Sequence, residues 1–165
     1  MALWQLFSLP RVSLKENVYN FAGSYKALEV AKYIVNKCSV ENKFISNLQL
    51  QKILYYTQQH FLKNEKKALF SDEIEAWPFG PVIREVYDYF CGFGSMKIFY
   101  LHQGYFSIKN EDKKIIDRIT VEKRILDPWA MVEDTHKKGK AWDLIYRGGI
   151  GYKETIPKRL IAENG

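Results

Sequence analysis

The sequence is poor in the residue types that build metal centres and disulfide frameworks. Its 165 residues include two cysteines, Cys38 and Cys91, and three histidines. Neither cysteine belongs to a C-x-x-C pair, and the histidines show no H-E-x-x-H spacing. The sequence therefore predicts no metal site and no cofactor. Both cysteines are expected to be reduced, small core residues of a cytosolic protein.

Long hydrophobic runs are also missing. Spanning a bilayer takes about 20 consecutive apolar residues, and no run approaches that length, so no membrane partner is expected. The start, MALWQLFSLP, has no basic region before its apolar stretch, and Gln5 and Ser8 interrupt that stretch. We therefore expect residues 1–22 to be an N-terminal extension, not a signal peptide, and residues 23–165 to form a single domain.

Motifs for catalysis or phosphate binding are not apparent. The GGIG stretch at 148–151 matches neither a P-loop nor a G-x-G-x-x-G fingerprint. Asp134 and His136 are neighbours along a predicted helix, and such neighbours do not generally converge as a triad. Glu73 and Glu75 share a strand face, where a solvated acidic edge is favoured over a pair of catalytic carboxylates. The sequence therefore predicts a protein that is not an enzyme.

Aromatic residues and positive charge are what the sequence does have. Aromatics make up 15% of the chain, and the net charge is +6. Aromatic side chains fill cores and also serve well at protein interfaces. A nucleic-acid binder concentrates its basic residues on one face, whereas here they are spread along the chain apart from Lys137, Lys138 and Lys140. A solvated basic surface is therefore favoured over a nucleic-acid partner.

Helical periodicity dominates the chain. In the second predicted helix, which Asn47 is expected to cap, Leu50, Ile53, Leu54, Thr57 and Phe61 form a core-facing stripe. Asp127-Pro128 is typical of a helix start. Helices are predicted over residues 24–38 (with Ser24 as the cap), 48–64, 81–90, 110–126, 128–139 and 140–147, with a last helical turn within 155–164.

Alternating patterns predict a small β element. Residues 73–78 and 97–108 alternate as short strands would, and the two segments could pair. Pro78 permits a strand edge, and Pro81 after the flexible Gly80 is expected to start a helix. The predicted fold is mainly α (α+β), a compact bundle of about six helices with a small antiparallel β element near residues 73–78 and 97–108.

Three sequence blocks resemble the Panacea antitoxin domain, which occurs in bacteria and prophages, often as a phage-associated protein. They are LQLQKILYY at 48–56, EAWPFGPV at 75–82 with EVY at 85–87, and Thr135-His136 followed by Trp142. The resemblance covers roughly residues 24–163. Ile53 stands where the pattern usually has leucine. The matching positions are Gln51, Lys52, Leu54, Tyr55, Tyr56, Glu75, Ala76, Trp77, Gly80, Pro81, Val82, Thr135, His136 and Trp142.

The resemblance implies a cytosolic, non-enzymatic antitoxin of a toxin–antitoxin pair, with its cognate toxin encoded by an adjacent gene. A rigid proline–glycine corner with large aromatics suits such binding, because little conformational freedom is lost. The expected partner-binding residues are Lys52, Tyr55, Tyr56, Glu75, Trp77, Phe79, Tyr87, His136 and Trp142. The expected structural residues of the motif are Gln51, Leu54, Ala76, Gly80, Pro81, Val82 and Thr135.

Three other functions stay open at this point. The protein could be a proteolytic adaptor that delivers a client to a protease. It could be a nucleic-acid-binding regulator that uses Lys137, Lys138, Lys140, Lys158 and Arg159. It could be a hydrolase at Asp134 and His136. The sequence leaves the identity of the toxin, the binding face and the oligomeric state open.

Overall fold

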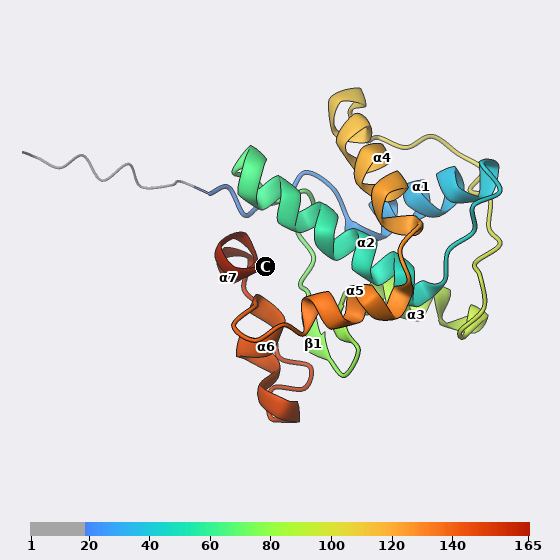
Figure 1. Cartoon of the computed structure of the whole chain (residues 1–165). Helices are drawn as coiled ribbons and strands as arrows, with labels where there is room; N and C mark the ends of the chain where they lie inside the picture. Colours follow the sequence, from blue (N-terminus) through green and yellow to red (C-terminus); the bar gives the residue numbers. More distant parts are fainter. Residues whose placement is uncertain (1–18) are drawn as a thin grey trace, which may run out of the picture.

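Helix α2 (Asn47–His60) runs through the middle of the molecule in the computed structural model, which describes residues 19–165 (Figure 1). Its residues from Gln49 to Gln58 are all buried, because other elements cover it from several sides. A π-helical turn, η1 (Phe61–Glu65), continues it, so the helix predicted over 48–64 is confirmed. The helices in contact with α2 are α1 (Ala27–Val40), α3 (Arg84–Phe90), α4 (Asn110–Arg124), α5 (Pro128–Thr135) and α7 (Lys158–Asn164).

The described residues hold seven α-helices and one two-stranded sheet, which confirms the mainly α class with a small antiparallel element. The seventh helix, α6 (Ala141–Tyr146), contacts α5, α7 and the first strand. Two short 3-10 turns, η2 (Cys91–Phe93) and η3 (Arg147–Gly149), follow α3 and α6. None of the helices in residues 19–165 combines the length and apolarity that crossing a membrane requires.

Local capping explains where several helices begin. Ser46, not Asn47, is the N-cap of α2, and it forms a reciprocal capping box with Gln49. Helix α1 begins at Ala27 and not near Ser24. The Ala27 N–H donates to the Asp72 carboxylate at 2.7 Å, so a residue distant in sequence satisfies this end of the helix. The predicted start of α5 at Pro128 is confirmed.

Strands β1 (Glu75–Trp77) and β2 (Gly80–Val82) form an antiparallel hairpin. The prediction that Pro81 starts a helix is wrong, since Pro81 lies in β2 opposite Ala76 and α3 begins at Arg84. Gly80 has a φ of +106°, which turns the chain back onto β1 before the helix begins. Proline is tolerated in β2 because that strand lies at the edge of the sheet.

The strands predicted over residues 97–108 are absent from the described structure, apart from a single bridge between Lys97 and Ser46. Side chains of α1 bind the backbone of this segment in place of a partner strand. The His102 N–H donates to Asn36 Oδ1 at 3.1 Å, and the Ser107 N–H donates to Glu29 at 2.8 Å. Because these contacts satisfy backbone donors, the segment is extended without belonging to a sheet.

The C-terminal segment supplies the pairing that residues 97–108 were expected to give. The Ala76 N–H donates to the Glu154 carbonyl oxygen at 2.9 Å, and the Lys153 N–H donates to the Ala76 carbonyl oxygen at 2.8 Å. The Ile156 N–H donates to the Ile74 carbonyl oxygen at 2.7 Å. Residues 153–156 thus fasten the hairpin to the α6–α7 end of the fold.

Two other expectations concern the N-terminus and the cysteines. Of the predicted extension at residues 1–22, residues 1–18 lie outside the described part of the chain. Asn20 exchanges backbone hydrogen bonds with Lys66 and Ala68, at 2.9 and 2.7 Å. Cys38 is buried as predicted, but Cys91 is exposed, because it lies in the turn that ends α3.

Candidate functional site

A groove of about 450 Å³ opens between the hairpin turn, the beginning of α2 and the beginning of α5. We call it the aromatic groove and define it by six of its lining residues: Trp77, Phe79, Val82, Tyr87, Trp129 and Tyr152. They come from four separate parts of the chain. Phe79, Tyr87, Trp129 and Tyr152 are 56%, 38%, 53% and 48% exposed, which is high for large apolar rings.

The rings of the aromatic groove contact one another. The centroids of Trp77 and Tyr87 lie 5.0 Å apart, and Trp77 meets Tyr152 edge to face at 6.1 Å. On the other side, Phe79 packs edge to face on Trp129, with centroids 5.3 Å apart. Such pairs contribute about 0.5–1.5 kcal/mol beyond their buried area. Contacts among the rings thus hold the lining of the groove in place.

Glu75 fixes the orientation of the Trp77 indole. Its carboxylate accepts a hydrogen bond from Trp77 Nε1 at 2.7 Å. It also accepts two from the Arg84 guanidinium, at 3.0 and 2.9 Å. Arg84 and Lys153 lie over the Trp77 ring at 5.7 and 5.5 Å from the centroid. The indole is thus held by a carboxylate at its edge and by two cations over its ring.

Beneath the hairpin, Lys52 of α2 reaches Gly80. The Lys52 side chain is completely buried, and Nζ donates to the Pro81 carbonyl oxygen at 3.5 Å. Within the described residues, no carboxylate forms an ion pair with it. Burial lowers the pKa of Lys52 to about 7. A Cβ on Gly80 would lie 2.6 Å from Lys52 Nζ and 2.8 Å from Thr135 Oγ1, so only glycine fits.

The third block of the motif supports the hairpin from the other side. Trp142 Nε1 donates to the Trp77 carbonyl oxygen at 2.8 Å. The His136 ring stacks on Trp142 with a centroid distance of 3.7 Å, and Tyr146 stacks next at 4.4 Å. Burial, and then the nearby Lys52, lower the pKa of His136. The three blocks, far apart in sequence, therefore meet under one hairpin.

The predicted partner-binding residues divide into two groups. Glu75, Trp77, Phe79 and Tyr87 lie together at the groove. The others lie beneath it or beside it. Lys52, Tyr55, Tyr56 and Trp142 are buried, with exposed fractions of 0%, 2%, 8% and 6%, and His136 is partly buried.

All seven residues expected to be structural are buried as well. Gln51 accepts the Ile83 N–H at 2.9 Å and donates to Asn47 at 3.1 Å, which ties α2 to the chain after β2. Thr135 donates to the Val132 carbonyl oxygen at 2.9 Å. Leu54, Ala76, Gly80, Pro81 and Val82 are also buried.

Sequence reasoning missed two members of the groove, Trp129 and Tyr152. Trp129 directly follows the proline that starts α5, and its side chain is exposed. A large aromatic residue in the first turn of a predicted helix was the sequence signal that could have identified it. Tyr152 lies after the glycine-rich turn, and it reaches Trp77 only because residues 153–156 pair with β1. No pattern in the sequence near Tyr152 predicts that pairing.

Asp134 and His136 do not form a catalytic pair in the structure. The Asp134 carboxylate accepts hydrogen bonds from Tyr56 at 2.7 Å, Lys137 at 2.8 Å and Lys140 at 3.1 Å. Burial alone would raise the pKa of Asp134, but these hydrogen bonds lower it by more, so the pKa lies below the ordinary carboxyl value. His136 Nε2 is buried without a hydrogen-bond partner in the described residues. No cluster of three His, Cys, Asp or Glu side chains suited to a metal occurs within residues 19–165.

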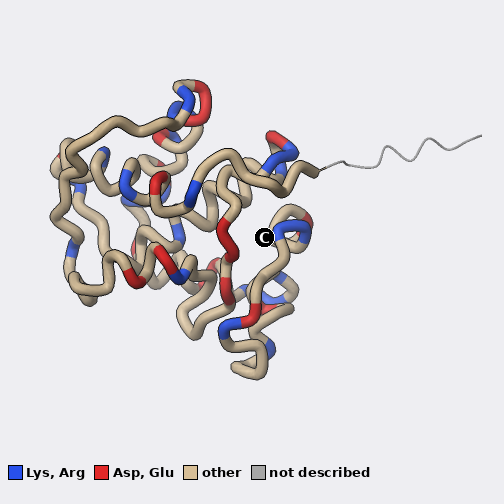
Figure 2. Tube along the Cα trace, turned by 180° about the vertical axis from the view of Figure 1, so that it is seen from behind, with Lys and Arg blue, Asp and Glu red and all other residues tan. Residues whose placement is uncertain are grey.

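The basic residues considered for nucleic-acid binding are spread out, and most of them form ion pairs or hydrogen bonds within the protein. Lys137 and Lys140 pair with Asp134, and Arg159 pairs with Glu163 at 3.0 Å. Lys158 donates to the Ser71 carbonyl oxygen at 2.9 Å. Figure 2 shows basic and acidic positions interspersed along the trace.

Comparisons with known proteins agree with this geometry. The family described as Antitoxin SocA-like, Panacea domain, matches residues 50–143. The matched range begins in α2, includes the hairpin and ends in α6, so it contains every matching motif position from Gln51 to Trp142. The chain belongs to the SocA-like Panacea family.

A curated relative supports the assignment over a longer range. Antitoxin SocA of Caulobacter vibrioides is 30% identical over 136 residues, which cover 76% of this chain and 72% of that protein. No solved structure matches the chain. In this Panacea domain, the motif residues of α2, the hairpin and α6 are mainly buried. They pack beneath the exposed rings of the aromatic groove.

Proposed function

We propose that this Panacea protein is an antitoxin that binds its cognate toxin, encoded by an adjacent gene, through the aromatic groove. The observation that carries the proposal is the groove itself, in which exposed rings are held in place by buried motif residues. Membership of the antitoxin family supports the role. The binding surface is inferred from the structure alone.

A preformed groove favours tight binding. Ordering a rotamer-rich side chain on association costs about 0.5–1.5 kcal/mol. Here Trp77 is already held by Glu75, and Phe79 already packs on Trp129. Large aromatic anchors surrounded by polar groups are the usual hot spots of protein interfaces. An apolar segment of the toxin can therefore bury these rings without first rearranging them.

The test combines growth with binding. The adjacent gene is expressed alone and together with the antitoxin, and the two purified proteins are mixed without any protease. We expect toxicity, rescue and a stable complex. Inhibition in the purified mixture indicates direct blocking, whereas loss of toxin only in cells that contain a protease indicates delivery to it. A harmless neighbouring product would contradict the assignment of the toxin.

Two substitutions test the groove. Phe79→Ala and Trp129→Ala each remove an exposed ring, and hot-spot truncations cost at least about 2 kcal/mol, or roughly 30-fold in affinity. Tyr105→Ala is the matched control, since Tyr105 is 87% exposed and lies outside the groove. If both groove variants bind and rescue as well as the control, the toxin uses another surface.

A further inference from the structure

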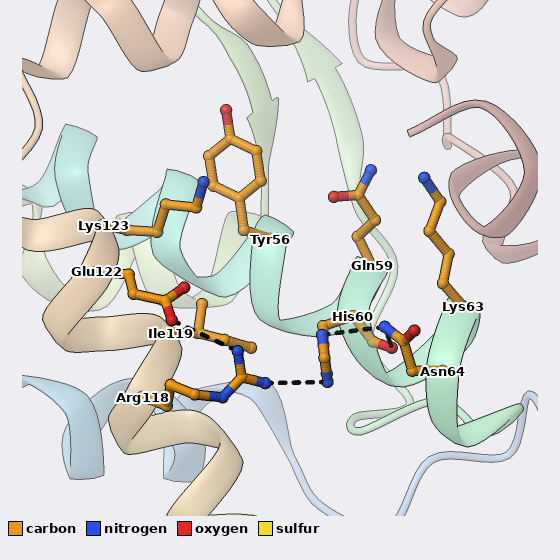
Figure 3. A pocket seen from close by; sticks show the side chains of 9 residues that line it. All are labelled: Tyr56, Gln59, His60, Lys63, Asn64, Arg118, Ile119, Glu122 and Lys123. Atoms are coloured by element: carbon orange, nitrogen blue, oxygen red, sulfur yellow. Dashed lines mark hydrogen bonds and ion pairs between the residues drawn. The ribbon is translucent and has the colours of Figure 1, made fainter.

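A second hollow, of about 180 Å³, lies between α4 and the C-terminal end of α2 with its π-helical turn η1 (Figure 3). Three cationic side chains, Lys63, Arg118 and Lys123, line it together with one carboxylate, Glu122. We call it the basic pocket. π-helical turns are rare, and they occur frequently at functional sites. Here the turn contributes Lys63 to the lining.

His60 lies at the floor of this pocket between two donors. An Arg118 guanidinium nitrogen lies 3.3 Å from His60 Nε2, and the Asn64 amide nitrogen lies 3.0 Å from His60 Nδ1. Figure 3 shows the three side chains in a row. A neutral imidazole accepts at only one nitrogen, and a protonated one accepts at none. The Asn64 amide nitrogen also donates to the His60 carbonyl oxygen at 3.1 Å, so the imidazole can accept from Arg118 at Nε2. The Arg118 guanidinium has further N–H donors beyond this one, and these can bind a ligand.

The cations of the pocket have few acceptors, and Lys63 donates to the Gly165 carbonyl oxygen at 3.4 Å. Lys123 Nζ lies 4.2 Å from the centroid of the Tyr56 ring, a cation–π contact that leaves its protons available. Arg118 forms only a long, exposed ion pair with Glu122, at 3.5 Å. Burial, and then Arg118, lower the pKa of His60, so the imidazole adds no charge of its own near pH 7. The pocket thus has an excess of donors and a net positive lining.

We propose that the basic pocket binds a small oxyanion of the phosphate class, with Arg118 and Lys123 as its main ligands. A guanidinium matches a phosphate in a bidentate arrangement, and the charge-assisted bonds are strong. Drug-sized ligands occupy roughly 300–1,000 Å³, so the smaller basic pocket holds one phosphate group, and the rest of any larger phosphorylated ligand lies outside it. The anion joins α2 to α4, independently of the aromatic groove.

The test is a titration of the whole chain at constant ionic strength. Binding is monitored by NMR of the backbone amides and the arginine side chains. The probes are inorganic phosphate, adenosine monophosphate and acetate. Inorganic phosphate is expected to give saturable shifts around residues 60–64 and 118–123, with at least about tenfold higher affinity than acetate. Tighter binding of adenosine monophosphate identifies a phosphorylated metabolite, and its exclusion identifies free phosphate.

Arg118→Gln is expected to weaken phosphate binding at least about tenfold. Lys114→Gln is the matched control, because it removes the same charge from an exposed position one turn earlier in α4. Equal, non-saturating responses to phosphate and acetate would overturn the proposal. So would an equal loss of binding in the two variants, since that result indicates general charge attraction only.

Discussion

The indole nitrogen of Trp142 donates a hydrogen bond of 2.8 Å to the backbone carbonyl oxygen of Trp77. This bond joins α6 to the last residue of β1, 65 residues away in sequence. Because the Trp77 side chain belongs to the aromatic groove and Trp142 does not, one buried tryptophan positions the backbone of a partly buried one that lines the groove. The motif residues therefore hold the hairpin in place as well as contributing side chains to the aromatic groove.

Trp142→Phe tests that support. Phenylalanine keeps an aromatic ring against His136 but removes the N–H, which leaves the Trp77 carbonyl without this donor. We expect a loss of about 1–3 kcal/mol in the free energy of unfolding, measured by urea denaturation. Trp129→Phe, on an exposed ring, should change stability by less than about 0.5 kcal/mol. Equal stability of Trp142→Phe and the wild type would show that the bond contributes nothing.

Lys52→Met is expected to stabilise the protein. The folded pKa of Lys52 is about 7, against 10.5 for an ordinary lysine. Between these values the unfolded chain binds a proton that the folded chain does not, so this lysine makes stability rise with pH in that range. Each unit of difference corresponds to about 1.4 kcal/mol. Methionine of similar volume removes this penalty, and the gain should be larger at pH 7 than at pH 9.

Lys43→Met, at an exposed position, is the control for Lys52→Met. Urea denaturation at both pH values should show the gain and its pH dependence for Lys52 alone. A destabilised Lys52→Met protein would show that the amine makes stronger polar contacts than its 3.5 Å bond to Pro81 indicates.

The sequence predicted the helices well because their signal is local. The apolar stripe of α2 lies on one face at helical spacing, and every member of it is buried in the structure. The proline that starts α5 acts within one turn. Such features need no knowledge of what packs against them, so they can be read from the sequence.

Lys52 and Pro81 show where this reading fails. Lys52 lies on the flank of the α2 stripe, and it contacts the hairpin at Pro81, 29 residues further along the chain. Pro81 could equally begin a helix or lie in an edge strand. The choice depends on the φ of Gly80 and on the pairing of residues 153–156 with β1. The groove depends on the same long-range contacts, which is why Tyr152 was missed.

Gly80→Ala is expected to be strongly destabilising, for two separable reasons. The residue has a φ of +106°, and a Cβ would lie 2.6 Å from Lys52 Nζ. Gly94 also has a positive φ, +57°, but nothing lies within 4 Å of its Cβ position, so Gly94→Ala reports backbone strain alone. We expect losses of about 1–3 kcal/mol for Gly94→Ala and more for Gly80→Ala. Similar losses for the two would show that the contacts with Lys52 and Thr135 relax freely.

Tyr56→Phe tests the link between α2 and α5. The Tyr56 hydroxyl donates to the Asp134 carboxylate at 2.7 Å, and burial followed by this carboxylate raises the pKa of the phenol. Hydrogen bonds to charged groups contribute about 1.5–3 kcal/mol, so we expect a loss of that size near pH 7. Tyr105→Phe, on an exposed ring, should be neutral.

The pH dependence of Tyr56→Phe distinguishes the charged hydrogen bond from simple packing. The contacts of Asp134 hold its pKa below the ordinary carboxyl value, so their contribution is complete above that value and is lost as Asp134 takes up a proton in acid. The stability difference between Tyr56→Phe and the wild type should therefore shrink as the pH falls below the ordinary carboxyl pKa. A difference that stays constant with pH would mean that the hydroxyl acts by filling space and not by binding the carboxylate.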